Sequence, residues 1–349
     1  ERENKVLYLA LSKFQKQIEE HTLKVNNEWR INAKNETAKY LKQGLVDRAI
    51  TRNLDWGVDV PIEGYEDKKL YVWIDAVLGY LTDTMYLCEN SEKSWEEFWK
   101  EGKNNKIYMC HGKDNIVFHS IILNALLLGQ EENYHLVDTI VSAEYLNYND
   151  QKFSKSKGVG MTALEALDIY DSDSLRYYLI SNGPEKKDTN FSSDEFVAVH
   201  NNEILNKFGN LVNRTLKFKG LEEIPEGNLD KEILEEIKST YEKSGELIEK
   251  LEFREACREI MKLVETANRY YDSKEPWKQK KENIEGFNDT IYTCTVIIAN
   301  LSNLFEIIMP KSCLKLRKYL DIKNASWNVI DKVKPGINLD DIEPLFNRI

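Results

Sequence analysis

The sequence predicts an α/β domain followed by an all-α domain. Up to about residue 190, short runs of β-forming residues alternate with segments of helical length, and beyond that point the pattern is almost wholly helical. A chain of 349 residues is long enough for two hydrophobic cores. Hydrophobic residues make up 42% and charged residues 31%, which is typical of a folded globular protein.

Three candidate strands in the first part are each followed by an apolar segment of helical length. They run over Leu70–Ile74, Lys106–Cys110 and Leu136–Val141. Strands that alternate with helices form a parallel sheet, and ligands bind at the carboxyl ends of its strands. Chemistry is therefore expected at Asp75, in the run His111–Asp114 and in the segment that begins at Ser142.

Beyond a boundary near Pro184, four long segments have helical periodicity. They cover Ser193–Lys219, Lys231–Lys250, Phe253–Tyr271 and Ile284–Met309. We expect Pro310 to end the last segment, because proline interrupts a helix. Turns rich in Gly, Pro and Asn join these segments, which favours an antiparallel helical bundle.

Composition limits the functions open to the chain. The formal net charge of −11 argues against general attraction to polyanions, so contact with a nucleic acid has to use local basic or polar patches. No run approaches the ~18 apolar residues of a spanning helix, and the N-terminus lacks the apolar centre of a signal peptide. We therefore expect a cytoplasmic protein that does not bind membranes. The first residue is not methionine, as expected where a sequence begins within a longer protein.

The five cysteines follow no pairing pattern. Cys88, Cys110, Cys257, Cys294 and Cys313 include no C-x-x-C spacing, which indicates neither a disulfide framework nor a zinc knuckle. We expect five buried thiols and no metal held by the protein. The sequence gives no indication of the oligomeric state.

A lysine-rich loop is the sharpest motif. The run Lys152–Gly158 (KFSKSKG) lies between a strand-like segment and a helix expected near Thr162–Ile169. Mobile ammonium groups on such a loop can neutralise the charge that develops when a triphosphate undergoes displacement at phosphorus. The alternative is a solvated lysine-rich turn.

The run His111–His119 (HGKDNIVFH) lies where a predicted strand ends and a helix begins. Gly112 would allow a nucleotide to approach the backbone, and Asp114 is placed to accept hydrogen bonds from ribose hydroxyls. In the alternative, Asp114 is an N-cap and His119 is a hydrogen-bonded core histidine.

The run Tyr71–Tyr80 (YVWIDAVLGY) reads as an aromatic strand that leads into a helix. A thioether is apolar, polarisable and a weak acceptor, so its pocket needs aromatic walls and one hydroxyl donor. Trp73 and Tyr80 can supply these groups. The alternative is that an aromatic-rich strand is simply part of the core.

The first helix of the bundle has two predicted faces. Ser192 and Glu195 form a capping box, and apolar residues at helical spacing form a core face: Ile204, Leu205, Phe208, Leu211 and Val212. At about 100° per residue, Glu203, Lys207, Asn210 and Arg214 fall on the opposite side, facing solvent. An amide and a guanidinium one turn apart can contact base edges, although a solvated face is the commoner meaning.

These segments together resemble methionyl-tRNA synthetases, which are class I aminoacyl-tRNA synthetases. Lys152–Gly158 is similar to the family's K-M-S-K-S loop, His111–His119 to its G-K-D-x-x-x-F-H segment, and Tyr71–Tyr80 to its Y-V-W-x-D-A-x-x-G-Y stretch, with Val77 where many bacterial members have proline. Thr51–Gly57 resembles S/T-R-D-L-x-W-G, with Asn53 for the usual aspartate. The alternative for Arg52 in this run is a surface arginine paired with a neighbouring acid such as Asp55 or Asp59. Asn206–Arg214 and Glu275–Trp277 resemble the family's anticodon-reading helix and loop. The resemblance runs from about Val6 to near residue 320.

The resemblance implies three sets of site residues. ATP would be bound by Arg52, Gly112, Asp114, Lys152 and Lys155, with Mg²⁺ accompanying it. Methionine would be bound by Trp73, Tyr80, Phe118 and His119, with Tyr80 donating to its sulfur. The CAU anticodon would be read by Asn210, Arg214 and Trp277. Lys155 is the leading catalytic candidate for stabilising the transition state, and Lys152 assists loop closure.

The implied activity is a methionine–tRNA ligase: ATP and L-methionine give methionyl-adenylate, and the methionyl group then passes to tRNA(Met). Residues 1–50 would end a connective insertion, 51–183 would form the second half of a Rossmann-like catalytic domain, and 184–349 the helical anticodon-binding domain. The family's H-x-G-H motif is not found, so we expect no activity from this portion alone. The alternative function is a non-enzymatic tRNA-binding or regulatory fragment derived from a synthetase.

Overall fold

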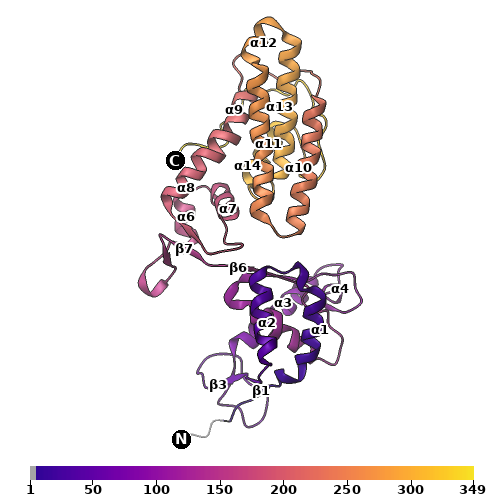
Figure 1. Cartoon of the computed structure of the whole chain (residues 1–349), viewed down its shortest axis with the longest axis vertical. Helices are drawn as coiled ribbons and strands as arrows, with labels where there is room; N and C mark the ends of the chain where they lie inside the picture. Colours follow the sequence, from indigo (N-terminus) through magenta and orange to yellow (C-terminus); the bar gives the residue numbers. More distant parts are fainter. Residues whose placement is uncertain (1–4) are drawn as a thin grey trace. The chain divides into compact units, whose positions relative to one another are not determined.

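The computed structural model describes residues 5–349, except for the side chain of Lys155. The chain forms two compact units (Figure 1). The first unit contains the chain up to Tyr145 together with Glu185–Lys187, and the second contains Leu146–Pro184 and Asp188–Ile349. This division by contacts differs from the compositional boundary near Pro184, and the domain limits drawn from composition stay a prediction.

The first unit combines helices with short paired strands. Its helices are α1 (Gln15–Val25), α2 (Ile31–Gln43), α3 (Val72–Cys88), α4 (Glu96–Trp99) and α5 (Leu123–Leu128), with single turns η1 (Leu11–Phe14), η2 (Asn26–Glu28) and η3 (Lys113–Asn115) and a π-helical turn η4 (Phe118–Ile122). Its strands are β1 (Tyr8–Leu9), β2 (Arg48–Ala49), β3 (Thr51–Arg52), β4 (Lys69–Leu70), β5 (Tyr108–Gly112) and β6 (Thr139–Ala143).

The parallel pair β5 and β6 confirms two of the predicted strands. Tyr108 pairs with Thr139 and Gly112 with Ala143, so the carboxyl ends of both strands lie at one edge. Ile140 in β6 packs in a buried cluster with Leu123 and Leu127 of α5. The sheet therefore presents Gly112 and the turn that follows it at the edge where ligands bind in such folds.

The predicted strand Leu70–Ile74 is wrong beyond Leu70. Helix α3 begins at Val72, and its buried residues include Ile74 and Val77. This spacing of three is helical, but the aromatic and β-branched residues of the run concealed it. Trp73 and Asp75 therefore lie in the first turn of a helix rather than on a strand.

The second unit contains a small sheet and a larger set of helices. In the sheet, β7 (Leu146–Tyr148) lies between β8 (Gln151–Lys152), which is antiparallel, and β9 (Thr189–Phe191), which is parallel. The helical elements are η5 (Lys155–Lys157), α6 (Ala163–Ile169), α7 (Ser172–Ser181), α8 (Ser193–Val199), η6 (His200–Gly209), α9 (Asn210–Leu216), α10 (Lys231–Glu249), α11 (Phe253–Lys274), α12 (Pro276–Glu282), α13 (Ile284–Leu304) and α14 (Pro310–Tyr319).

The long helices confirm the predicted bundle. Helices α10, α11 and α13 lie side by side, with α12 at one end of α11 and α13 (Figure 1). The expectation for Pro310 is wrong, because α13 ends at Leu304 and Pro310 is the first residue of α14. Proline suits a first helical position, where its missing N–H is not needed. The carboxylate of Asp173 on α7 accepts a hydrogen bond from the Ser312 amide at 2.6 Å and so caps α14.

The first helix of the bundle is not a uniform α-helix. Between α8 and α9, the segment η6 is a π-helix, with wider turns than the 100° spacing assumes. The predicted core residues Ile204, Phe208 and Leu211 are fully buried. The Ser192 side chain caps α8, but the Glu195 carboxylate accepts from the Tyr178 hydroxyl at 3.1 Å.

Two expectations for individual side chains are also corrected. Five buried thiols were expected. Cys257, Cys294 and Cys313 are buried, but Cys88 is half-buried and Cys110 is exposed. Successive side chains of a strand point to opposite faces, and in β5 the side chain of Met109 is buried whereas that of Cys110 is exposed. Within residues 5–349, no helix combines the length and apolar character needed to cross a bilayer.

Candidate functional site

An aromatic pair joins α3 to η4 in the first unit. The rings of Trp73 and Phe118 stack with their centroids 4.7 Å apart and an interplanar angle of 22°. Both side chains are half-buried, while Ile74 and Val77 occupy the core positions of α3. This arrangement favours a pocket-wall role over the core alternative, because the residues that fill the core are their neighbours.

Tyr80 and His119 form a second contact between the same two elements. The Tyr80 hydroxyl lies 3.0 Å from Nε2 of His119, whose Nδ1 lies 2.8 Å from the carbonyl oxygen of Asn115. His119 is only 2% exposed and Tyr80 is 42% exposed. Burial lowers the pKa of His119. His119 is thus hydrogen-bonded as the core alternative expects, but one of its partners faces solvent.

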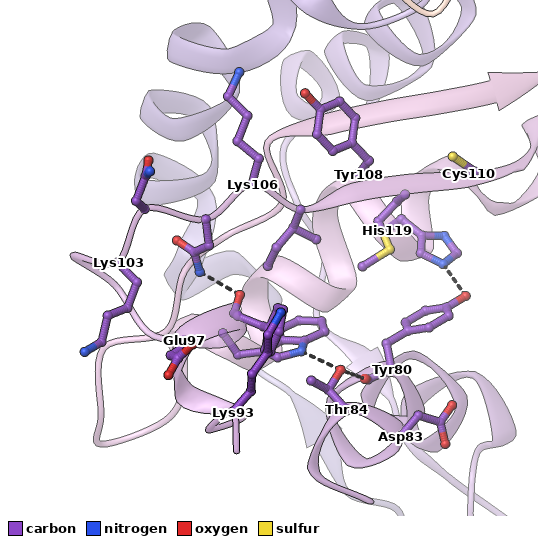
Figure 2. A pocket seen from close by; sticks show the side chains of 16 residues that line it. Tyr80, Asp83, Thr84, Lys93, Glu97, Lys103, Lys106, Tyr108, Cys110 and His119 are labelled. Carbon is purple, nitrogen blue, oxygen red and sulfur yellow. Dashed lines mark hydrogen bonds between the residues drawn. The ribbon is translucent and has the colours of Figure 1, made fainter. Parts of the chain in front are cut away.

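These two residues form one end of a cleft of about 870 Å³. Figure 2 shows Tyr80 and His119 turned toward each other at that end, with Lys103 on the opposite side. Met109 also lines the cleft. The Tyr80–His119 end combines aromatic, imidazole and hydroxyl groups, which suits an apolar ligand with one weak acceptor. The rest of the cleft is lined largely by charged and polar side chains, among them Asp83 and Glu97.

His111 also belongs to this cluster, although the sequence predicted no individual role for it within the run His111–Asp114. Its ring stacks on His119 with centroids 4.3 Å apart and an interplanar angle of 19°, and its Nδ1 lies 2.9 Å from the Gly112 carbonyl oxygen. Burial lowers the pKa of His111 to about 4, although the bond to Gly112 acts in the opposite sense. In the sequence, its position near the end of a predicted strand and directly before Gly112 could have indicated a role in the site.

Gly112 and Asp114 lie at the carboxyl edge of the sheet. Gly112 has φ −75°, which any residue adopts, and a Cβ added there would meet no atom within 4 Å. Glycine therefore provides space at this position rather than conformational freedom. The exposed carboxylate of Asp114 accepts a hydrogen bond from the Tyr145 hydroxyl at 2.5 Å. Its side chain makes no capping bond to η3, so the N-cap alternative is not supported.

Arg52 lies at the end of β3. Its guanidinium stacks over the ring of Tyr71 at 4.3 Å, and its Nη1 donates to the carbonyl oxygens of Ala49 and Thr51, each at 2.9 Å. The alternative pairing with Asp59 is not supported, because Asp59 pairs with Lys69. The guanidinium is held by neutral groups and keeps its positive charge available to a ligand.

The lysine loop belongs to the second unit. Lys152 ends β8, and Ser154 and Val159 exchange backbone hydrogen bonds of 2.9 and 3.0 Å that close the loop behind the lysines. Gly160 has φ 128°, and a Cβ there would lie 2.3 Å from the Phe153 ring. The backbone of Lys155 is in η5, and its side chain lies outside the described part of the chain. The backbone of the loop is therefore held in a defined, hydrogen-bonded conformation.

Arg214 is held more firmly than periodicity predicts. Its Nη1 donates to the Asp272 carboxylate at 2.8 Å, its Nη2 donates to the Asn268 carbonyl oxygen at 2.7 Å, and its guanidinium lies 4.1 Å over the Tyr271 ring. The side chain is only 20% exposed. The expectation of a free guanidinium in solvent is therefore wrong, because α11 packs along this side of α9.

Of the other three residues predicted to face solvent, one is exposed and two contact neighbouring helices. Asn210 is exposed, as predicted. Lys207 pairs with Glu265 at 2.7 Å, and Glu203 accepts from the Tyr177 hydroxyl at 2.6 Å. The π-helical segment turns these two side chains toward α11 and α7.

Trp277 completes a cluster around Tyr271. It follows Pro276 at the start of α12, is 45% exposed, and its ring lies 6.3 Å from that of Tyr271. Tyr271 therefore lies against both Arg214 and Trp277 and donates its hydroxyl to the Arg214 carbonyl oxygen at 2.8 Å. Helices α9, α11 and α12 thus bring together two residues that the sequence separates by 63 positions.

Protein-bound metal has no candidate cluster in the described part of the chain. Among residues 5–349, no three or more His, Cys, Asp and Glu side chains are grouped to hold an ion.

Two family models match the chain. The model described as tRNA synthetases class I (M) matches residues 1–216, and the model described as the anticodon binding domain of methionyl tRNA ligase matches residues 222–349.

Curated relatives agree with these matches. The chain is 41% identical to methionine–tRNA ligase 1 of Alkaliphilus oremlandii over 346 residues, which cover 98% of this chain and 63% of the relative. It is 42% identical to methionine–tRNA ligase of Bacillus cereus over 354 residues, which cover 99% of this chain and 64% of the relative. The chain therefore spans slightly less than two thirds of the length of these relatives.

The fold is also similar to solved structures. Mycobacterium tuberculosis methionyl-tRNA synthetase in complex with methionyl-adenylate matches with a TM-score of 0.87 and 24% identity, covering 99% of this chain and 69% of that one. Its apo form matches with a TM-score of 0.82 and 23% identity. The likeness confirms the predicted fold class, an α/β part followed by a helical domain.

Proposed function

The chain belongs to the methionyl-tRNA synthetase family, and we propose on this premise that it contributes to activating L-methionine with ATP and to charging tRNA(Met). In this reaction, a carboxylate oxygen of methionine attacks the α-phosphorus of ATP, and pyrophosphate leaves. The 3′-terminal hydroxyl of the tRNA then attacks the methionyl carbonyl, and AMP leaves. A cytoplasmic location, where these substrates meet, is part of the proposal.

The observation that carries the methionine assignment is the cleft end formed by Tyr80 and His119. It offers the methionine side chain one hydroxyl and one imidazole. The Trp73–Phe118 pair joins the same two elements, α3 and η4, but does not line this cleft. An aromatic surface suits a polarisable thioether, and a hydroxyl can donate to its sulfur. We assign these four residues to methionine binding.

The edge of the sheet supports the ATP assignment. The open space beside Gly112 leaves room for a nucleotide against the backbone, and the exposed carboxylate of Asp114 can accept from ribose hydroxyls. Arg52 supplies a positive charge for phosphate groups. Mg²⁺ enters with ATP as part of the substrate.

The lysine loop supplies the charge stabilisation that displacement at phosphorus requires. We assign Lys155 to the transition state and Lys152 to loop closure, because no covalent group is needed for in-line displacement. The loop's closed backbone and its ammonium groups support this assignment.

The bundle supports tRNA recognition through its own cluster. We assign Asn210 and Arg214 to base-edge contacts and Trp277 to stacking on an anticodon base. Exposed aromatic rings beside polar side chains are the usual means of binding unstacked bases.

Two measurements test the function. A full-length polypeptide carrying this chain should exchange pyrophosphate into ATP only when methionine is present, and the 349-residue chain should bind tRNA(Met). Binding without exchange would favour a non-enzymatic RNA-binding function. The loss of both would refute the proposal.

A further inference from the structure

The direction of the hydrogen bond between Tyr80 and His119 follows from the partners of His119. The carbonyl oxygen of Asn115 can only accept, so the hydrogen on the imidazole is on Nδ1, 2.8 Å away. Burial favours the neutral ring. Nε2 is then an acceptor, and the Tyr80 hydroxyl at 3.0 Å must be the donor.

This direction conflicts with a simple role for Tyr80 as donor to a thioether. A hydroxyl has one hydrogen, and here that hydrogen is committed to His119. A sulfur atom in the cleft would meet only the lone pairs of the Tyr80 oxygen. If His119 takes a proton on Nε2, the bond reverses: the imidazolium N–H donates to the Tyr80 oxygen, and the hydroxyl hydrogen turns toward the cleft.

We propose that Tyr80, His119 and His111 select the thioether as one unit, in which protonation of His119 frees the Tyr80 hydroxyl and His111 is a positioning residue for the His119 ring. The proposal rests on the proposed methionine-binding function. It adds a specificity-determining residue, His111, and a pH dependence that Tyr80 alone would not produce.

The position of His111 explains how it acts. Its ring lies 4.3 Å from the His119 ring and nearly parallel to it, and its Nδ1 donates to the Gly112 carbonyl oxygen. The ring is therefore fixed to the end of β5 and supports one face of His119. Its Nε2 is buried and makes no hydrogen bond among the described residues, so it does not compete for Tyr80.

The pKa of His119 is shifted by burial, which lowers it, and by the bond to the Asn115 carbonyl oxygen, which raises it. From α3, the titratable residues along the cleft are Tyr80 and Asp83, and from β5 they are Tyr108, Cys110 and His111. From α4 and the loops beside it, the cleft is also lined by Glu97, Lys93, Lys103 and Lys106. From α2, Thr37 bonds to Ser120 of η4, and this pair is uncharged. Protonation of His119 is therefore opposed chiefly by burial, and its effect should appear below the ordinary histidine pKa of ~6.5.

The test compares methionine with norleucine, which has a methylene in place of sulfur. In a full-length polypeptide carrying this chain, the ratio of kcat/KM for the two amino acids is measured by pyrophosphate exchange from pH 5.5 to 8. The ratio should rise as pH falls, by up to about fivefold, the factor that one hydrogen bond contributes. In His119→Gln the ratio should be independent of pH.

The same assay isolates His111. His111→Ala should lower the ratio at acidic pH, and His111→Phe, which keeps a flat ring against His119, should restore most of the loss. Tyr86→Phe on the exposed side of α3 is the matched control and should behave as the wild type. A wild-type ratio that does not change with pH, or His111→Ala equal to wild type, overturns the inference.

Nitrogen-15 NMR of the imidazoles in the 349-residue chain tests the same arrangement without activity. The Nδ1–H tautomer of neutral His119 is expected, and an Nε2–H tautomer at neutral pH overturns the inference. Absence of methionine-dependent exchange in the wild type would instead refute the proposed function, so the two failures are distinguishable.

Discussion

The anticodon assignment can be tested by removing one side chain at a time from the cluster around Tyr271. Trp277 is 45% exposed, which leaves part of its surface available for a base to stack on. Loss of such a stack typically costs ~1 to 3 kcal/mol, or roughly 5- to 150-fold in affinity. Trp277→Ala should weaken binding of tRNA(Met) by that factor.

Arg214→Ala should have two separable effects. Loss of a base-edge contact costs ~1 to 3 kcal/mol in affinity. The change also removes the hydrogen bonds to Asp272 and Asn268 and the stack on Tyr271, so the melting temperature of the chain should fall. Trp277→Ala leaves those bonds in place and should change the melting temperature less.

The assay is equilibrium binding of tRNA(Met) to the 349-residue chain at fixed salt, with the natural CAU anticodon and with its first base changed. Trp327→Ala is the matched control, because Trp327 is 42% exposed and packs against Tyr241 elsewhere in the bundle. Both site variants should lose affinity for the natural tRNA and little for the altered one. Equal weakening on both would reduce Arg214 to a phosphate contact, and no weakening on either would refute the assignment.

Three further predictions concern the catalytic half and are tested in a full-length polypeptide. Lys155→Ala should lower kcat for pyrophosphate exchange by ~100-fold or more with little change in the KM for methionine, and the reverse pattern would contradict its role. Tyr80→Phe should lower the preference for methionine over norleucine by ~1 kcal/mol at acidic pH, and an unchanged ratio would make Tyr80 a packing residue. Gly112→Ala should raise the KM for ATP while the melting temperature stays unchanged, because the backbone tolerates alanine and only open space is filled. A fall in melting temperature with an unchanged KM would show that the space is not used.

The sequence predicted most of the architecture because its signals were local. The parallel pair β5–β6 and the long helices of the bundle follow from hydrophobic periodicity within single segments. The prediction of a strand at Leu70–Ile74 was wrong because the residue types there favour a strand, whereas the spacing of the apolar residues favours a helix. The segment forms a helix, which buries Ile74 and Val77 on one face. The π-helical turns of η6 could not be foreseen, since an assumed period of 3.6 residues excludes them.

The site was predicted less completely because its geometry depends on residues far apart in the sequence. Asp272 fixes Arg214 from 58 positions away, and Tyr145 contacts Asp114 from 31 positions away. The stacking of His111 on His119 depends on the path of the chain through η3, between β5 and η4. The sequence gives the type of each of these residues, but it does not show which of them meet in the folded chain.

The held guanidinium of Arg214 helps to reconcile RNA binding with a net charge of −11. A free arginine loses side-chain entropy when it orders on a base, whereas Arg214 is already oriented by Asp272 and Tyr271. Asp272 also offsets its charge, so attraction to phosphate in general is weakened while directed donors remain. Binding that depends on a few oriented contacts should show a shallow salt dependence, because the slope of log affinity against log salt is about −0.9 or −0.7 per neutralised phosphate. A slope for tRNA(Met) corresponding to six or more phosphates would contradict this explanation and would require a basic surface outside the cluster.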